Sequence, residues 1–296
     1  MYRARTKRLV PSEGEGESMK QKHADYKMVS YPKIRRFMAA AFRSAQHTPI
    51  MHGLIEVDVT RARAFLREQK ANTGESLSFT AFLIACLAKA VEEHKAVQAI
   101  RLGSKRLILF EEVDVFTMIE RDVAGQVPIM ASIVRAANRK TVREIHQEIR
   151  AAQREDVEKV VKWLQFQPTL LFRPFFWVFS WIGRRSPHLW KKYVGTVGIT
   201  AVGMFGNGAA WGIPPALPIL MITVGGIGEK PVLVDGHIAL REYLSLTISF
   251  DHDLIDGAPA ARFTERLKDL IESGYGLGDS TVESGQAVAP ETAKKS

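Results

Sequence analysis

The sequence predicts an α+β fold in which helices flank a large sheet that is mixed or mostly antiparallel. Strand and helix patterns follow one another in a mixed order along the 296 residues, which is typical of this class. The clearest pattern lies at 243–272, where strand alternation gives way to apolar residues at helical spacing after Gly257. Before that point the large apolar residues share one strand face: Leu244, Leu246, Ile248 and Phe250.

Each remaining element is predicted from its own period and from the residues that break it. In the first half we expect helices at 33–46, 60–70, 79–94 and 138–155, a strand at 50–60, and two or three strands within 106–135 that turn at D-V-A-G-Q (122–126). In the second half we expect strands at 195–202, 218–225 and 237–251 and a last helix at 257–273.

Composition excludes several kinds of protein. The one cysteine, Cys86, cannot form an intrachain disulfide, and its apolar helical surroundings favour a buried structural thiol over a nucleophile. No Cys/His cluster has metal-ligand spacing, so no metal is expected, and no motif indicates a nucleic-acid partner. The N-terminus has no apolar run typical of a secretory signal, so we expect a cytoplasmic protein.

Charge is concentrated at the N-terminal end. Residues 1–43 carry eleven Lys/Arg against four Asp/Glu, which accounts for most of the net charge of +9. Residues 1–30 are therefore expected to form a mobile basic arm, either solvated or in contact with an acidic partner or a membrane surface. Residues 275–296, rich in Gly, Ser and Ala, are expected to form a disordered tail.

A candidate catalytic group lies where the strand at 237–251 ends. His252 precedes the last helix, and Asp256 follows it by four residues. A strand-to-helix turn presents side chains from a rigid support, and histidine suits proton transfer near neutral pH. The spacing alone is weak, because His-x-x-x-Asp is a common pattern in proteins with no such role.

Five segments in order extend this motif into a family resemblance. D-H-D-L-I-D-G (251–257) resembles the D-H-R-x-x-D-G motif of dihydrolipoamide acyltransferases, the core component of 2-oxo acid dehydrogenase complexes, and is similar to the H-H-x-x-x-D-G of chloramphenicol acetyltransferase. The other four are I-E-V-D-V-T (55–60), A-N-R-K-T-V-R-E-I (137–145), G-T-V-G-I-T-A-V-G-M-F-G (195–206) and I-P-P-A-L-P-I-L-M-I-T-V-G-G-I (213–227).

The resemblance implies a chloramphenicol acetyltransferase-like fold built as a homotrimer or a higher assembly, with 31–274 as the acyltransferase catalytic domain. It implies that His252 is the general base, that Asp256 holds the histidine loop in shape, and that Thr200 stands where the family has its oxyanion-stabilising serine. His252 and Thr200 would then meet across a subunit boundary. No metal is implied.

The resemblance also implies which substrates the protein binds. Coenzyme A and its acyl thioester are the expected ligands. Pro214 and Pro215 match the family's coenzyme-side loop, or alternatively form only a rigid turn before a strand. No segment in front of 31–274 resembles a lipoyl domain, so a lipoyl group is expected only in trans, from another protein.

Two positions depart from the family pattern. Asp253 replaces the arginine that follows the histidine, and a carboxylate there would favour the imidazolium unless it faces solvent or pairs with a compensating arginine. Ala40 and Ala41 replace a basic pair. These changes leave open a second function, a weak or inactive scaffold that keeps the trimeric fold and assembles at a membrane.

An aromatic-rich insertion at 157–193 has no counterpart in the family. It holds four of the five tryptophans: Trp163, Trp177, Trp181 and Trp190. Arg173 and two prolines argue against a bilayer-spanning helix. Peripheral membrane contact and packing, against a neighbouring subunit or over an acyl pocket, remain equally open.

Overall fold

The chain divides into two units, residues 1–32 and residues 33–296. Of the first unit, the computed structural model describes 28–31, which are exposed. In the second unit it describes 35–36, 39–40, 42–43, 48–103, 105–120, 129–154, 174–175, 178, 186–201, 208–215, 217 and 219–278. The turn expected at 122–126 lies outside these residues, as do most of the helix expected at 33–46 and most of the aromatic insertion.

Six strands form one mixed sheet in the order β1-β8-β7-β6-β4-β5. β4, β6 and β7 run parallel to one another, whereas β1, β8 and β5 pair antiparallel with their neighbours. The bounds are β1 Ile50–Asp58, β4 Val115–Glu120, β5 Ile129–Val134, β6 Val197–Ala201, β7 Leu220–Val234 and β8 His237–Asp251. The predicted mixed sheet is confirmed.

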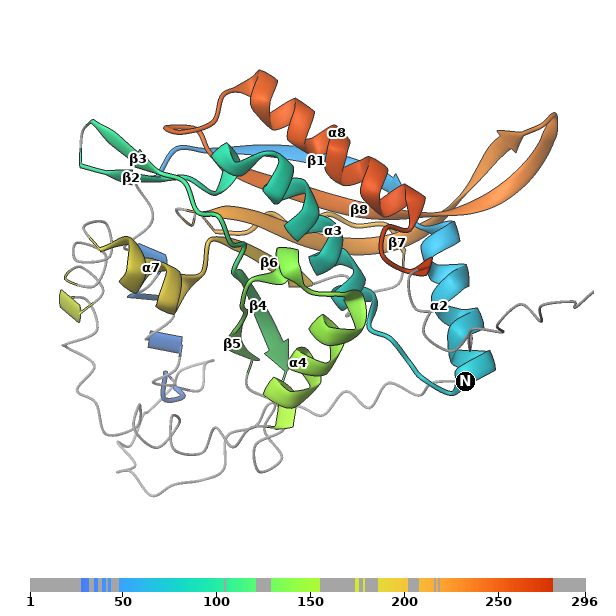
Figure 1. Cartoon of the computed structure of the whole chain (residues 1–296), viewed down its shortest axis with the longest axis horizontal. Helices are drawn as coiled ribbons and strands as arrows, with labels where there is room; N and C mark the ends of the chain where they lie inside the picture. The colour runs from blue at the N-terminus through green and yellow to red at the C-terminus, as the bar shows by residue number, and fades with distance from the viewer. Residues whose placement is uncertain are drawn as a thin grey trace, which may run out of the picture. The chain divides into compact units, whose positions relative to one another are not determined.

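Helices surround this sheet much as the sequence predicts (Figure 1). The α-helices with fully described bounds are α2 Thr60–Thr73, α3 Phe79–Glu93, α4 Val142–Arg154, α7 Pro187–Val194 and α8 Gly257–Ser273. Short 3-10 turns follow α3 at Lys95–Gln98 (η1) and precede α4 at Ala137–Arg139 (η2). All but α7 lie within a few residues of their predicted positions.

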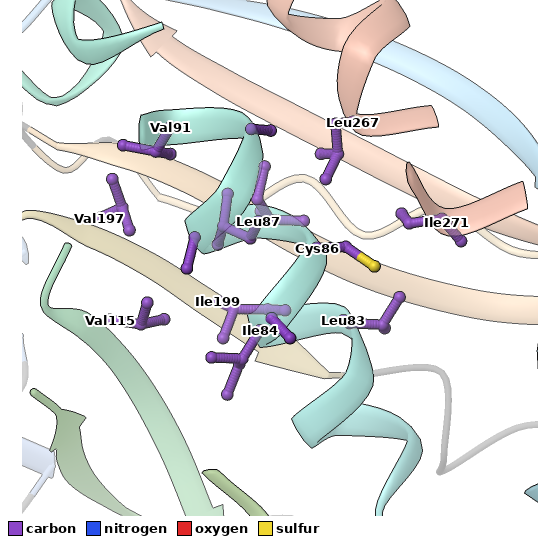
Figure 2. Packing of buried hydrophobic residues seen from close by; sticks show 14 of the residues in the cluster. Leu83, Ile84, Cys86, Leu87, Val91, Val115, Val197, Ile199, Leu267 and Ile271 are labelled. Atoms are coloured by element: carbon purple, nitrogen blue, oxygen red, sulfur yellow. The ribbon is translucent and has the colours of Figure 1, made fainter. Parts of the chain in front are cut away.

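Helix α3 is the centre of the main hydrophobic core. Every residue from Ala81 to Ala88 is buried, because the sheet lies on one side of the helix and α4 and α8 lie on others. Figure 2 shows its side chains between those of β4 and β6 and those of α8. Cys86 is buried here as predicted; burial raises the pKa of its thiol, and its Sγ lies 3.6 Å from the Leu270 carbonyl.

A smaller core covers the opposite face of the sheet. Its buried members come from β2 (Ile100–Leu102), from α7, from the start of β7 and from the loop after β3 (Arg106–Ile108): Ile100, Phe110, Trp190, Ile219 and Met221. Trp190 is thus the one tryptophan of the aromatic insertion that the described residues include, and it is a core residue. Packing, rather than membrane contact, explains this part of the insertion.

Helix α7 is attached to the sheet by a buried carboxylate. Arg135 donates from Nη1 to Asp114 Oδ2 at 2.7 Å and to the Lys191 carbonyl at 2.7 Å. Asp114 also accepts the backbone N–H of Ala136 at 2.9 Å. This network fixes the end of α7 beside β4 and β5, so the chain enters β6 in a defined place.

The β7–β8 hairpin extends well past the end of β1 (Figure 1). β7 was expected to end at residue 225, but it continues to Val234 beyond an irregularity between Val224 and Ile227. Asp235 and Gly236 form its turn with φ values of 49° and 81°, the left-handed pair that a type I′ turn requires. We call residues 229–242 the hairpin arm.

The C-terminal end stays packed slightly beyond the predicted boundary. The tail was expected to begin at residue 275, but Leu277 is buried in the main core and its N–H bonds to the Gly274 carbonyl at 3.2 Å. An apolar side chain just after the helix accounts for the difference. Residues 279–296 lie outside the described part of the chain.

Candidate active site

The turn that carries His252 is held by backbone bonds and by Asp251. The His252 N–H donates to the Pro49 carbonyl at 2.8 Å, which ties the turn to the entry of β1. The Asp251 carbonyl accepts from Leu254 and Ile255 at 3.1 and 3.0 Å, and its Oδ1 accepts from the Asp253 N–H at 3.0 Å. The imidazole is presented from this fixed turn with 47% of the side chain exposed.

Asp256 occupies the N-cap position of α8, but its side chain forms no capping hydrogen bond with the helix. Its Oδ1 lies 3.8 Å from His252 Nδ1, within ion-pair range but too long for a hydrogen bond, and its side chain is 90% exposed. In the described chain Asp251, which the sequence did not single out, braces the turn. The role expected for Asp256 stays a prediction.

Asp253 pairs with an arginine from a distant element. Arg101 Nη1 lies 3.7 Å from Asp253 Oδ2. Both alternatives open for Asp253 are found, because its side chain is also 47% exposed. Arg101 belongs to β2, a three-residue strand that the sequence did not predict and that pairs only with β3. No local pattern connects the two positions, which is why the pair was missed.

Thr200 lies in a row of threonines that crosses the sheet. It pairs in register with Thr223 of β7, which pairs with Thr247 of β8. Thr223 and Thr247 are buried, and their hydroxyls have no hydrogen-bond partner. The part of this sheet face around Thr200 is therefore polar, unlike the part beside Met221 that the smaller core covers.

One chain does not bring Thr200 and His252 together. Thr200 is two strands away from Thr247, and His252 follows Thr247 by five residues. Strands lie about 4.8 Å apart and advance about 3.4 Å per residue, so the two backbones are separated by roughly 20 Å. Neither side chain is long enough to close that distance.

Pro214 and Pro215 lie in the segment that connects β6 to β7. The described part of this segment, which begins at residue 208, approaches β7 so closely that a Cβ on Gly226 would lie 1.9 Å from the Gly208 carbonyl oxygen. The Gly226 N–H donates to the Ala210 carbonyl at 2.8 Å. Contact with the backbone of Gly226 therefore fixes this segment against β7, and the segment leads into the two prolines.

Trp211 extends the same segment toward the edge of the sheet. Its Nε1 donates to the Ile55 carbonyl of β1 at 3.3 Å. Together these contacts place the segment along β7 and within reach of β1, while Ile219 at its end returns it to the core beside Met221.

The predicted alanine pair at positions 40 and 41 is described only in part. Ala40 is buried, whereas Ala41 lies outside the described residues. Among the residues that the structure describes, no cluster of three or more His, Cys, Asp or Glu could hold a metal ion, and no helix is long and apolar enough to cross a membrane.

Comparison with known proteins gives one consistent family. Residues 23–167 and 193–277 match the model of the 2-oxoacid dehydrogenases acyltransferase (catalytic domain). The gap between these two matches falls within the aromatic insertion.

The chain is also similar to curated and solved members. It is 24% identical over 269 residues to the lipoamide acyltransferase component of the branched-chain alpha-keto acid dehydrogenase complex of Bacillus subtilis (strain 168), covering 89% of this chain and 56% of that protein. The chain spans about half the length of the curated relatives it matches.

Two solved structures share its fold. A probable dihydrolipoamide acetyltransferase from Listeria monocytogenes 4b F2365 aligns with a TM-score of 0.63 and 23% identity over 85% of this chain and 97% of that chain. The cubic core of a pyruvate dehydrogenase multienzyme complex aligns with a TM-score of 0.61 and 20% identity over 87% and 98%. The chain therefore shares the fold of these two structures, and the predicted α+β class is confirmed.

Proposed function

The chain belongs to the family of 2-oxoacid dehydrogenase acyltransferase catalytic domains, and from this premise we propose that it transfers acyl groups between coenzyme A and a thiol or hydroxyl acceptor. The observation that carries the proposal is His252, presented half-exposed on a turn that backbone bonds hold to β1. A lipoyl group supplied by another protein is the favoured acceptor or donor.

His252 acts as the general base in this proposal. A neutral imidazole takes the proton from the attacking thiol, and the sulfur then adds to the thioester carbonyl. The carbonyl oxygen becomes negative, the tetrahedral intermediate collapses, and the bond to the departing sulfur breaks while His252 returns the proton to that sulfur. The reaction exchanges one thioester for another, so it needs no oxidant and no metal.

Thr200 donates a hydrogen bond to the negative oxygen in the same step. Losing one such donor costs about 3–4 kcal/mol of transition-state stabilisation. Because roughly 20 Å separates Thr200 from His252 within one chain, the Thr200 that serves a given His252 comes from a neighbouring subunit. The active site is thus complete only in an oligomer.

The hairpin arm supports assembly with further copies. Leu233 and Ile238 face each other across its ladder and are 71% and 79% exposed, and Leu240 nearby is 65% exposed. Exposed apolar side chains gathered on one projecting ribbon are typical of protein interfaces. We propose a homotrimer, as the family resemblance implies, in which each subunit gives a site residue to one neighbour and receives one from the other, with higher assembly as found for the cubic core described above.

Pro214 and Pro215 are proposed to line the coenzyme side of the site. The segment before them is fixed on β7 by the Gly226–Ala210 bond and on β1 by Trp211. Proline side chains have little conformational freedom, so they can form a rigid surface that holds the coenzyme with its sulfur in one position.

The decisive experiment mixes two inactive variants. His252→Ala lacks the base and Thr200→Ala lacks the donor, so each alone should lose most activity in an assay of acyl transfer from acyl-CoA to dihydrolipoamide. After the two are unfolded and refolded together, a site whose His252 comes from one variant and whose Thr200 comes from the other is intact. With random assortment about a quarter of all sites are intact.

The matched control is His252→Ala refolded with wild-type chain, which sets the activity expected from simple dilution. Recovery near a quarter supports both residue roles and their separate origin. No recovery contradicts the shared site, and full activity of His252→Ala alone contradicts the base. Absence of acyl transfer from the wild-type chain itself would favour the scaffold alternative.

A further inference from the structure

The β2–β3 hairpin exposes apolar side chains on its outer face. Its inner face packs into the smaller core, where Ile100 is buried and Ile108 is partly buried. Arg101 pairs with Leu107 across the hairpin, so these two side chains share the opposite face. Leu107 is 56% exposed, and Leu109, two residues further along, is 53% exposed. A ribbon packed on one side is expected to be polar on the other, so two neighbouring exposed leucines indicate a contact surface.

Helix α7 adds further apolar side chains next to this hairpin. Trp190 of α7 and Ile100 of β2 are buried in the same smaller core, which joins the two elements. Leu189 and Tyr193, four residues apart and therefore on one face of the helix, are 39% and 56% exposed. Lys192 Nζ lies 5.3 Å from the centre of the Tyr193 ring. The hairpin and α7 are thus packed together, and each of them exposes apolar side chains.

Positive charge is concentrated in the same place. We call residues 95–112 and 186–194 the basic region, because they hold six Lys/Arg against two Asp/Glu, a net charge of +4. Residues 44–296 carry +2 in all, which is the +9 of the chain less the +7 of residues 1–43, so the remainder of 44–296 is slightly acidic. Within the part of the chain that the structure describes, Lys105 and Arg106 near the hairpin tip form no ion pair.

The composition of the basic region favours a lipid surface over an acidic protein. Lysine, tyrosine and leucine together are typical of segments that lie between lipid head groups and acyl chains, whereas lysine is depleted from protein–protein interfaces. Helix α7 also closes the aromatic insertion, of which the family model leaves residues 168–192 unmatched. Two described residues of the insertion, Phe175 and Val178, are 49% and 44% exposed. The surface is therefore supplied in part by sequence outside the family match.

We propose that the basic region is a docking surface for anionic membranes. Leu107, Leu109 and Tyr193 enter the head-group layer, while Lys105 and Arg106 contact the negatively charged lipids. A few apolar side chains and a few cations bind a membrane reversibly when they act together, and this attachment needs no spanning helix. The proposal does not depend on acyl transfer, because none of these residues is assigned to the candidate active site.

The test is co-sedimentation of the full chain with vesicles of phosphatidylcholine and phosphatidylglycerol, with vesicles of phosphatidylcholine alone as the uncharged comparison. Leu107→Gln should weaken binding to the charged vesicles about fivefold, because half or more of a leucine side chain no longer leaves water. Lys105→Gln combined with Arg106→Gln should weaken it about fivefold for each cation, or about thirtyfold together. Raised salt should weaken binding of the wild type in the same direction.

Matched controls make the same kinds of change elsewhere. Tyr275→Gln removes an aromatic side chain that is 39% exposed beyond the end of α8. Arg61→Gln combined with Lys70→Gln removes two exposed cations from α2 and so changes the net charge by the same amount as the test variant. Each control should bind within about twofold of the wild type, because screening confines the effect of a charge to its neighbourhood.

A local probe separates this surface from residues 1–43, whose charge of +7 also attracts anionic lipid. Cys86 is buried and the pKa of its thiol is raised, so an engineered Leu107→Cys is labelled selectively with an environment-sensitive fluorophore. The emission of this label should shift to the blue when charged vesicles are added. The same label at Tyr275→Cys should show no shift.

The outcomes are distinct. A blue shift at position 107 together with weaker binding of both test variants supports the proposal. Vesicle binding without that shift, or no binding of the wild type, overturns it. If the charge variant weakens binding to poly-glutamate as much as to vesicles while Leu107→Gln changes neither, the surface fits an acidic protein and the proposal is wrong. It is also wrong if Leu107→Gln changes the sedimentation mass but not vesicle binding, because the surface then lies between copies of the chain.

Discussion

Replacing Gly226 by alanine should detach the segment that carries Pro214 and Pro215 from β7. The new Cβ would lie 1.9 Å from the Gly208 carbonyl oxygen, where contacts below 3.0 Å essentially never occur, so backbone must move by about 1.1 Å. Crowding of this kind costs about 1–3 kcal/mol. Loss of the Gly226–Ala210 hydrogen bond adds about 1 kcal/mol, so we expect a total of about 2–4 kcal/mol.

The assay is urea unfolding of the full chain at fixed concentration, followed by KM for acyl-CoA. Gly53→Ala is the matched control, because Gly53 is also a strand glycine but its Cβ would meet only the Ile248 carbonyl at 3.9 Å. It should be neutral or slightly stabilising. If Gly226→Ala unfolds within about 0.5 kcal/mol of Gly53→Ala, the close approach does not hold the segment, and our placement of it is wrong.

Two further predictions concern stability. Burial lowers the pKa of His146, whose Nδ1 accepts the Ser78 N–H at 3.0 Å, so the unfolded chain binds a proton that the folded chain does not. The melting temperature should therefore fall as pH drops below about 6.5. His146→Asn, which retains an acceptor, should flatten this dependence. If the melting temperature has the same pH dependence in the variant and the wild type, His146 is not the cause. Trp190→Ala should cost about 3–5 kcal/mol in urea unfolding, whereas Trp190→Phe should cost under about 1.5 kcal/mol because its buried Nε1 has no partner to lose; a harmless Trp190→Ala would mean that the side chain is not core.

Elements with an unbroken local period were predictable from sequence. β8 and α8 were placed because alternation and helical spacing meet at one point, and α3 because a long apolar run can only be a buried helix. The position of His252 follows from the first of these. Its half-exposed presentation at the end of a strand required nothing beyond the neighbouring residues.

Other elements depend on partners far away in the chain. β2 has three residues and owes its position to Ile100 in the smaller core. The strand predicted at 218–225 stops short of the end of β7, because the glycines beyond Val224 admit another segment and the strand continues past them to Val234. Helix α7 lies within the aromatic insertion, for which the sequence left membrane contact and packing equally open.

The site shows the same division. His252 was found from a local pattern, but the pairing of Asp253 with Arg101 joins residues about 150 positions apart, and nothing in either neighbourhood indicates it. The separation of Thr200 from His252 likewise depends on strand order, which the sequence does not specify. The expectation that they meet across a boundary came from the family resemblance, and the strand order now supports it.

The long hairpin has a mechanical consequence for the catalytic turn. β8 pairs with β1 from Tyr243 to Asp251 and with β7 from His237 to Ser249. Its inner part is therefore paired on both edges, whereas its outer part, residues 237–242, is paired on one. The irregularity between Val224 and Ile227 of β7 lies close to the point where pairing on both edges ends. The outer part is therefore held by fewer hydrogen bonds than the part that ends at His252, and local opening of the hairpin arm need not disturb the turn that presents the imidazole.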